Sequence, residues 1–172
     1  MTARFRSYDS DGNPVIDKSV AGTGGSGDAG KVVHLNSSGK FPDDVLPDRG
    51  LLTATASEAL TAGSYVALHT VSGATRCRLA DNSNLREAIG FVKAAVASGS
   101  SASIYPRTGM NDSLSSLTVG SHYWMGTSGS ETDTALDLTD SGNINSGHQY
   151  LGVAIATDTI DGTNSTRMEK IL

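Results

Sequence analysis

The sequence predicts an all-β fold, a small β-sandwich or β-barrel domain preceded by an extended, glycine-rich N-terminal arm. From Leu51 onward, short apolar segments recur at intervals of about 8 to 15 residues, and Gly, Ser, Asn or Asp closes each one, as in sandwiches and barrels. Only 37% of the residues are hydrophobic and 5% are aromatic, so small and β-branched side chains must build the core. The 172 residues suit one domain with an appendage, which we place at residues 51–172 and 1–50 respectively.

Segments with the composition of strands follow one another along the second part, at residues 52–56, 64–71, 75–80, 88–96, 102–105, 122–125, 149–157 and 166–172. Alternation assigns their faces, so that Val66 and Leu68 share one face of the segment 64–71. In the segment 149–157, Leu151, Val153 and Ile155 share a face opposite small residues. A small face lets a second backbone approach closely, as in a narrow barrel or a contact between subunits.

Gly90 and Gly152 each lie between bulky apolar residues in two similar segments, 88–95 and 150–157. Paired strands with a bulge or a close backbone contact at these glycines would explain the similarity. The only segment with a helical composition, residues 84–89, is too short to form a stable helix and ends at Gly90. We therefore expect a turn there that leads into a strand.

The first 50 residues have the composition of an arm. Residues 7–14 carry turn-forming Asp, Gly, Asn and Pro, and residues 21–30 form a glycine-rich tether whose ordering would be entropically costly. Residues 31–35 predict a short strand, and a tight turn follows at residues 36–39.

An apolar anchor bracketed by Pro42 and Pro47 ends the arm. Such a cluster in an otherwise polar segment implies that a partner surface covers it. The residues that we expect to contact a partner are Arg4, Phe5, Arg6, Val33, Leu35, Phe41, Val45 and Leu46.

Charge argues against nucleic acid and membrane partners. The formal net charge is -5, and residues 108–166 contain acidic side chains but no Lys or Arg, whereas nucleic acids and anionic membranes require clustered positive charge. The N-terminus lacks the apolar region of a signal peptide, and no apolar run approaches the ~20 residues of a membrane helix. We expect synthesis in the cytoplasm.

The sequence offers no evident catalytic or metal site. His34, His69, His122 and His148 are scattered without metal-ligand spacing, and the lone Cys77 lacks an adjacent base, so it is expected to be an inert strand cysteine. There is no Gly-x-Ser-x-Gly elbow between a strand and a helix. We expect no enzyme, no metal and no cofactor. Two alternatives stay open, a metal site shared between subunits at a threefold axis and a trimeric β-enzyme of the nucleotide hydrolase kind.

The few aromatic residues allow two interpretations. Tyr123 and Trp124, with Tyr105 and Tyr150, would form a sugar-stacking patch if they shared one exposed face. Half-buried anchoring within strands is the alternative, which we favour because so few aromatics are available to build a core.

Five motifs follow one another in a fixed order: GKVVHLNSSGKFPDDVLP at 30–47, TATASEALTAGSYV at 53–66, AIGFV at 88–92, LxxLxxGxxYW at 114–124 and QYLGVA at 149–154. This order resembles structural proteins of tailed bacteriophages, namely capsid decoration and head fibre proteins. The first motif also resembles a segment of phage tail fibre proteins. In such proteins the Leu-Thr-Ala-Gly step opens a strand, the Gly-x-x-Tyr step ends a turn, and the closing strand carries a Gly-x-Ala core.

The resemblance implies a virion structural protein, a decoration (cement) or head fibre protein that binds the major capsid protein lattice, forms a homotrimer and stabilises the head. It implies a location on the capsid surface. The alternative is a tail fibre or receptor-binding module that recognises a host surface glycan.

Overall fold

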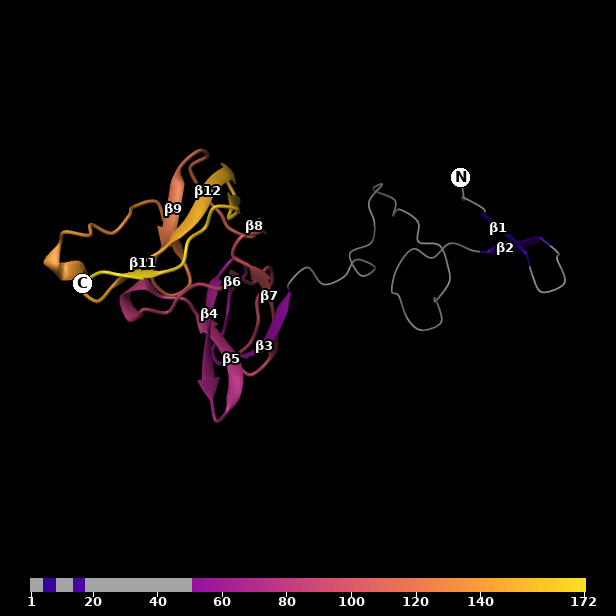
Figure 1. The fold of residues 1–172 in the computed structure, drawn as a ribbon, viewed down its shortest axis with the longest axis horizontal. Coiled ribbons are helices and arrows are strands. Elements are labelled where there is room, and N and C mark those ends of the chain that lie inside the picture. Colours follow the sequence, from indigo (N-terminus) through magenta and orange to yellow (C-terminus); the bar gives the residue numbers. More distant parts are fainter. Residues whose placement is uncertain (1–4, 9–13, 18–50) are drawn as a thin grey trace. The chain divides into compact units, whose positions relative to one another are not determined.

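The computed structural model describes residues 5–8, 14–17 and 51–172 (Figure 1). The chain divides into two units, Met1–Arg49 and Gly50–Leu172. In the first unit, β1 (Phe5–Tyr8) and β2 (Pro14–Asp17) pair in antiparallel fashion, with Phe5 opposite Asp17. The sequence does not predict these two strands, and the turn predicted at residues 7–14 overlaps their ends. The predicted tether, the strand at 31–35 and the anchor lie outside the described residues.

The second unit is all-β, and its described residues contain no α-helix. Five of its strands close into a barrel, in the order β3-β5-β4-β6-β7. These are β3 (Leu52–Ala56), β4 (Tyr65–Val71), β5 (Ala74–Leu79), β6 (Gly90–Phe91) and β7 (Ser101–Pro106). Strand β3 runs parallel to β5 and antiparallel to β7, which completes the closure.

Small side chains fill the barrel. Alternation along the strands directs Ala54 and Ala56 of β3, Val66 of β4 and Cys77 of β5 into the interior. Ile104 of β7 is 1% exposed and packs in the same cluster. A barrel this narrow needs no aromatic residue in its interior, which explains the low aromatic content of the sequence.

A second sheet has the order β10-β9-β12-β13-β8. Its strands are β8 (Met110–Asn111), β9 (His122–Met125), β10 (Glu131–Thr132), β12 (Tyr150–Ala156) and β13 (Thr159–Asp161). We call it the five-stranded sheet. Figure 1 shows β9 and β12 side by side, on the opposite side of the unit from β3 and β5.

Short elements complete the unit. Strands β11 (Gly147–His148) and β14 (Glu169–Lys170) form a two-stranded sheet, and the 3-10 turns are η3 (Asn82–Asn84) and η4 (Ser141–Asn143). Turn η3 occupies part of the segment predicted as a turn before β6. Its N-cap is Asp81, whose carboxylate accepts hydrogen bonds from the Ser83 backbone N–H and hydroxyl.

The barrel and the five-stranded sheet share a second apolar cluster. Tyr65 and Phe91 of the barrel pack there with Met125 and Leu151 of the sheet, and all four are at most 2% exposed. The rings of Tyr65 and Phe91 meet edge to face with centroids 6.1 Å apart, a favourable aromatic geometry. The two layers therefore bury one face of the five-stranded sheet and leave the other face open.

The prediction of an all-β fold with a barrel is confirmed, and β3 and β9 have the predicted bounds. The predicted strand at 88–96 is wrong beyond Phe91, because bends at residues 93 and 94 break it before Val96 bridges to Leu60. The predicted pairing of Gly90 with Gly152 is also wrong, since the two glycines lie in different sheets.

Both glycines nevertheless meet a closely approaching backbone, as predicted. A Cβ on Gly90 would lie 2.2 Å from the Tyr105 carbonyl oxygen, and one on Gly152 would lie 2.1 Å from the Asp161 carbonyl oxygen. Gly152 also has φ +150°, which L-residues rarely adopt. Close packing of neighbouring strands therefore explains the similar segments without a repeat.

Candidate binding surface on the five-stranded sheet

The residues that the sequence assigns to partner binding belong to the first unit. Phe5 and Arg6 lie in β1, opposite Asp17 and Ile16 of β2. The others, Arg4, Val33, Leu35, Phe41, Val45 and Leu46, lie outside the described residues. Attachment through the arm stays a prediction, and a second candidate surface comes from the open face of the five-stranded sheet.

Strand β9 has two chemically different faces. Tyr123 and Met125 are 6% and 1% exposed and point into the unit, whereas His122 is exposed and Trp124 is half-buried on the opposite side. The Tyr123 hydroxyl accepts a hydrogen bond from the Thr118 backbone N–H at 2.9 Å, which fixes the inner face. The strand therefore presents His122 and Trp124 outward from a rigid position.

Strand β12 adds Tyr150 to this outer face. Tyr150 pairs with Trp124, but after it the register shifts, so that Gly152 pairs with Tyr123 and Val153 with His122. The extra residue is Leu151, which is 1% exposed. The prediction that Leu151 shares a face with Val153 and Ile155 is therefore wrong, because the bulge turns Leu151 into the core.

Four rings gather on the outer face, and we call them the aromatic ledge: His122, Trp124, His148 and Tyr150. Trp124 and Tyr150 meet edge to face with centroids 5.8 Å apart, and His122 lies 5.6 Å from Tyr150 and 6.2 Å from Trp124. His148 of β11 lies 6.5 Å from Trp124 on the other side. Trp124 thus stands at the centre of a continuous aromatic surface.

Hydrogen bonding fixes the ledge. His122 Nδ1 and the Tyr150 hydroxyl oxygen are 2.9 Å apart. Burial, and then the negative charge of Asp161, raise the pKa of the Tyr150 hydroxyl above its usual value. The hydroxyl therefore keeps its proton at neutral pH, and it donates a hydrogen bond to His122 Nδ1 in the tautomer in which that nitrogen carries no proton.

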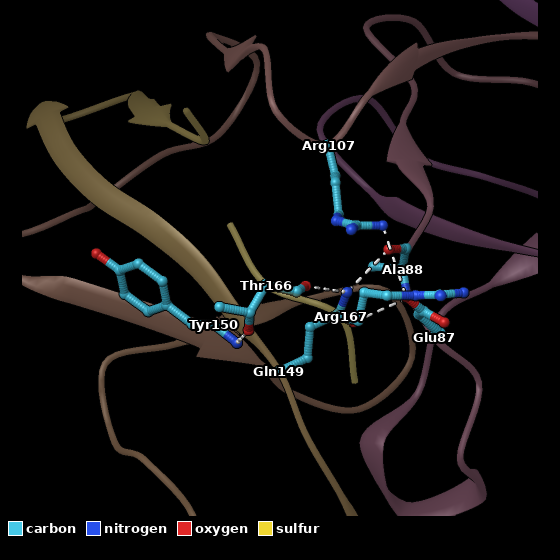
Figure 2. Close-up of polar contacts among 7 residues, drawn as sticks. All are labelled: Glu87, Ala88, Arg107, Gln149, Tyr150, Thr166 and Arg167. Carbon is cyan, nitrogen blue, oxygen red and sulfur yellow. Dashed lines mark hydrogen bonds and ion pairs between the residues drawn. The ribbon is translucent and has the colours of Figure 1, made fainter. Parts of the chain in front are cut away.

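The junction with the barrel holds the Tyr150 backbone (Figure 2). The buried Gln149 side chain accepts a hydrogen bond from the Ala88 N–H and donates to the Ala88 carbonyl, both at 2.9 Å. It also donates to the Thr166 carbonyl at 3.1 Å, and the Thr166 hydroxyl accepts from the Tyr150 N–H at the same distance. Figure 2 shows the Tyr150 ring pointing away from this network.

Ion pairs at the same junction are weaker contributions. One Glu87 carboxylate oxygen lies 3.5 Å from an Arg107 nitrogen and 3.6 Å from an Arg167 nitrogen (Figure 2). The Arg167 side chain is 84% exposed, so water screens its interaction with Glu87. The buried amide of Gln149 is therefore a firmer polar connection between barrel and sheet than these ion pairs, alongside the hydrogen bond at 2.8 Å that Asn111 Nδ2 of β8 donates to the Gly63 carbonyl.

Of the four aromatic residues considered for a sugar-stacking patch, only Trp124 and Tyr150 share the outer face, and the favoured interpretation, anchoring within strands, describes the other two. Tyr123 is buried on the inner face, and Tyr105 stacks on Phe91 of the barrel with centroids 5.8 Å apart. Sequence reasoning missed His122 and His148. The alternation around Trp124 could have indicated His122, whereas His148 reaches the ledge through β11, which the sequence pattern does not predict.

Catalytic chemistry has little support in the described residues. His69 Nε2 and the Ser57 hydroxyl oxygen are 2.8 Å apart, a nucleophile-base pair that sequence reasoning did not foresee. However, no described residue hydrogen-bonds to Nδ1 of His69, so the pair lacks the orienting third group of a triad. Cys77 is fully buried, and burial raises the pKa of its thiol, as expected for an inert cysteine.

The described residues likewise show little support for a catalytic pocket or a metal site. A hollow of about 200 Å³ is lined by residues that include Ser64, Ser113, Ser130 and Glu131, and it contains no His or Cys. Among residues that the structure describes, no three His, Cys, Asp or Glu side chains converge as metal ligands. In the same residues, no helix has the length and apolar character needed to span a bilayer.

By its fold, the second unit belongs to the all-β barrel proteins and carries an open aromatic sheet face. No family model matches the chain, and no curated protein matches it. Among solved structures, the chain is similar to the head fiber gp8.5 N base in bacteriophage phi29, with 15% sequence identity and a TM-score of 0.41. The similarity covers 71% of this chain and 96% of that one.

Proposed function

We propose that this protein is a structural component of a tailed-bacteriophage virion, a capsid decoration or head fibre protein. In this proposal it forms a homotrimer on the capsid surface, and its N-terminal arm binds the major capsid protein. Binding of this protein to the assembled lattice lowers the free energy of the assembled shell, and so stabilises the head. The proposal includes no enzymatic activity, cofactor, nucleic acid or membrane partner.

The order of the phage-like motifs carries this proposal, together with the positions that these motifs take in the fold. Gly63, which closes the Leu-Thr-Ala-Gly step, has φ +83° two residues before β4 begins. Gly120 of the Gly-x-x-Tyr step has φ +84° two residues before β9 begins. Gly152 and Ala154 are buried in β12. In these three motifs of the second unit, the glycine thus has a structural reason.

The arm is proposed as the attachment element because its apolar anchor has no evident use within a polar, glycine-rich segment. Burial of Phe41 and Leu46 on a capsid would contribute roughly 1.5 to 3 kcal/mol each. The double variant Phe41→Ala with Leu46→Ala should therefore weaken binding to particles about a hundredfold or more. Removal of apolar surface at Leu172, which is 93% exposed in the second unit, provides the matched control, and Leu172→Ala should bind normally.

The experiment combines a binding assay with copy counting. Particles that lack the protein are mixed with wild-type or variant protein, and the bound copies per particle are quantified by gel densitometry. Many copies over the head support decoration, whereas a few copies at one vertex indicate a tail protein. Wild-type binding by the double variant, with an unchanged melting temperature, would exclude the arm as the attachment element. Light scattering should give three times the 17.7 kDa chain mass.

A further inference from the structure

We infer that the aromatic ledge is a binding site for a neutral carbohydrate. The apolar C–H faces of a sugar ring can pack on the faces of Trp124 and Tyr150, while its hydroxyl groups bond to polar groups around the ledge. The inference goes beyond the proposed function and does not depend on it, because the ledge lies in the second unit and attachment is assigned to the arm.

The position of the aromatic residues needs an explanation that the core does not provide. The inner face of β9 and β12 already supplies Tyr123, Met125 and Leu151 to buried clusters. Trp124 is the only tryptophan of the chain, and it lies half-buried on the opposite face, among three other rings. Aromatic side chains that gather outside a completed core are typical of recognition surfaces, because they offer large contact area at low entropic cost.

Polar groups flank the rings on the same face. The pairing of His122 with Val153, and of Val153 with Asp161, places Asp161 on the outer face beside the Tyr150 hydroxyl. Asp161 Oδ1 accepts hydrogen bonds from the Thr163 N–H and hydroxyl, and these bonds lower the pKa of the carboxyl. Oδ2 accepts no hydrogen bond from any described residue. It remains available to a sugar hydroxyl.

On the other side of the ledge, Thr132 of β10 is the cross-strand neighbour of Trp124, and Glu169 of β14 is the neighbour of His148. Cross-strand neighbours project to the same face, so a hydroxyl and a carboxylate border the rings there as well. Carboxylates on both sides of an aromatic platform suit a ligand rich in hydroxyl donors.

Charge selects a neutral ligand over an anionic one. Residues 108–166 supply β9, β12 and β13 and contain no Lys or Arg, and Lys170 of β14 alternates with Glu169 and so projects to the face opposite the ledge. An anionic glycan or a nucleic acid would require clustered cations on the ledge itself. The carboxylates of Asp161 and Glu169 would repel either of these anionic ligands. A second copy of the same chain would face like charge across this surface, which makes self-association through the ledge unfavourable.

The test uses the emission of Trp124, the sole tryptophan, in the purified full-length protein. The probes are maltotetraose, cellotetraose and N-acetylchitotetraose, with oligogalacturonate as an anionic comparison. We expect a saturable emission change with at least one neutral probe, a dissociation constant of about 1 mM or below, and no change with the anionic probe. Isothermal titration calorimetry measures the same binding in variants without tryptophan.

Two variants and one control locate the site. Trp124→Ala should weaken binding at least tenfold, and Tyr150→Phe, which keeps the ring but removes the hydroxyl, should weaken it about threefold. Tyr105→Phe changes a half-buried tyrosine on the barrel and should bind as wild type. Absence of saturable binding to all three neutral probes would overturn the inference, as would wild-type affinity in Tyr150→Phe and Trp124→Ala. Emission that varies with protein concentration instead of sugar would identify a second copy as the occupant.

Discussion

The barrel and the five-stranded sheet of the second unit differ in whether their strands close on themselves and in how many of their faces are buried. The barrel closes on itself, so its strands pair all round and its small apolar side chains are sealed inside. The five-stranded sheet is open, ends in the two-residue strands β8 and β10, and buries only one face. Short edge strands limit unwanted strand pairing. The sheet can therefore expose aromatic side chains on its face without a long edge strand whose backbone is free to pair with another chain.

This difference separates residues that maintain the fold from residues available for recognition. Inside the barrel, packing alone accounts for each side chain, because Ala54, Ala56 and Cys77 are buried and small. On the outer face of the sheet, packing does not account for Trp124 or Tyr150, since the core is complete without them. Substitutions should therefore affect stability in the barrel and binding on the sheet.

The largest expected contrast is chemical accessibility. Cys77 is fully buried and its sulfur donates a weak hydrogen bond to the Ala54 carbonyl at 3.7 Å, so a thiol reagent reaches it only when the barrel opens. Labelling should be slower than in denaturant by at least about a thousandfold, since folded domains are stable by about 5 kcal/mol or more. Acrylamide should quench Trp124 in the same folded sample. Labelling within tenfold of the denatured rate would refute a sealed barrel.

Much of the barrel was predictable because its strands follow the simple alternation of side chains. Strands β3, β4 and β5 lie within one residue of their predicted bounds. Two-residue strands such as β8 and β11 were not predictable from the sequence, because two residues are too few to show a periodic pattern. Their pairing also depends on chain segments that are far away in sequence.

The ledge was only half predictable for the same reason. Trp124 and Tyr150 were recognisable as candidate stacking residues by type. Their grouping with His148 depends on tertiary contact between β9 and β11, and the bulge at Leu151 changes which residues of β12 face outward. A one-residue register shift exchanges the faces of a strand, and alternation alone does not reveal where it occurs.

The next contrast compares the same substitution in the two regions. Ile104→Ala removes a side chain that is 1% exposed and packs over Gly90, so it should reduce the free energy of unfolding by about 2 to 5 kcal/mol. Ile155→Ala removes the same atoms from the outer face, where the residue is 49% exposed, and should cost no more than about 0.5 kcal/mol. Urea denaturation measures both. Similar losses would show that the outer face is covered, for example by another subunit.

A smaller effect is expected at the junction. Gln149→Leu preserves the approximate volume but leaves the buried Ala88 N–H and carbonyl without partners, which should cost about 1 to 3 kcal/mol. Because Tyr150 follows directly in the chain, the emission of Trp124 should also change. A variant as stable as the wild type would show that water or neighbouring groups satisfy Ala88, and that Gln149 does not connect the two layers.

The smallest expected effect is a pH dependence of the barrel. Burial, and then the positive charges of Arg78, Arg76 and Arg86, lower the pKa of His69 below its usual value, although Glu58 partly opposes them. The unfolded chain therefore takes up a proton at a higher pH than the folded protein does, and the free energy of unfolding falls as the pH drops below about 6.5.

The variant His69→Gln removes this proton uptake, so its melting temperature should decrease less between pH 7.5 and pH 5 than that of the wild type. The effect is small because the side chain is only half-buried and water screens the charges. Arg78→Gln keeps the histidine but removes the arginine that has the largest effect on the pKa of His69. It should therefore reduce the pH dependence of the melting temperature partially. Equal pH dependence in all three proteins would show that the arginines do not act on His69.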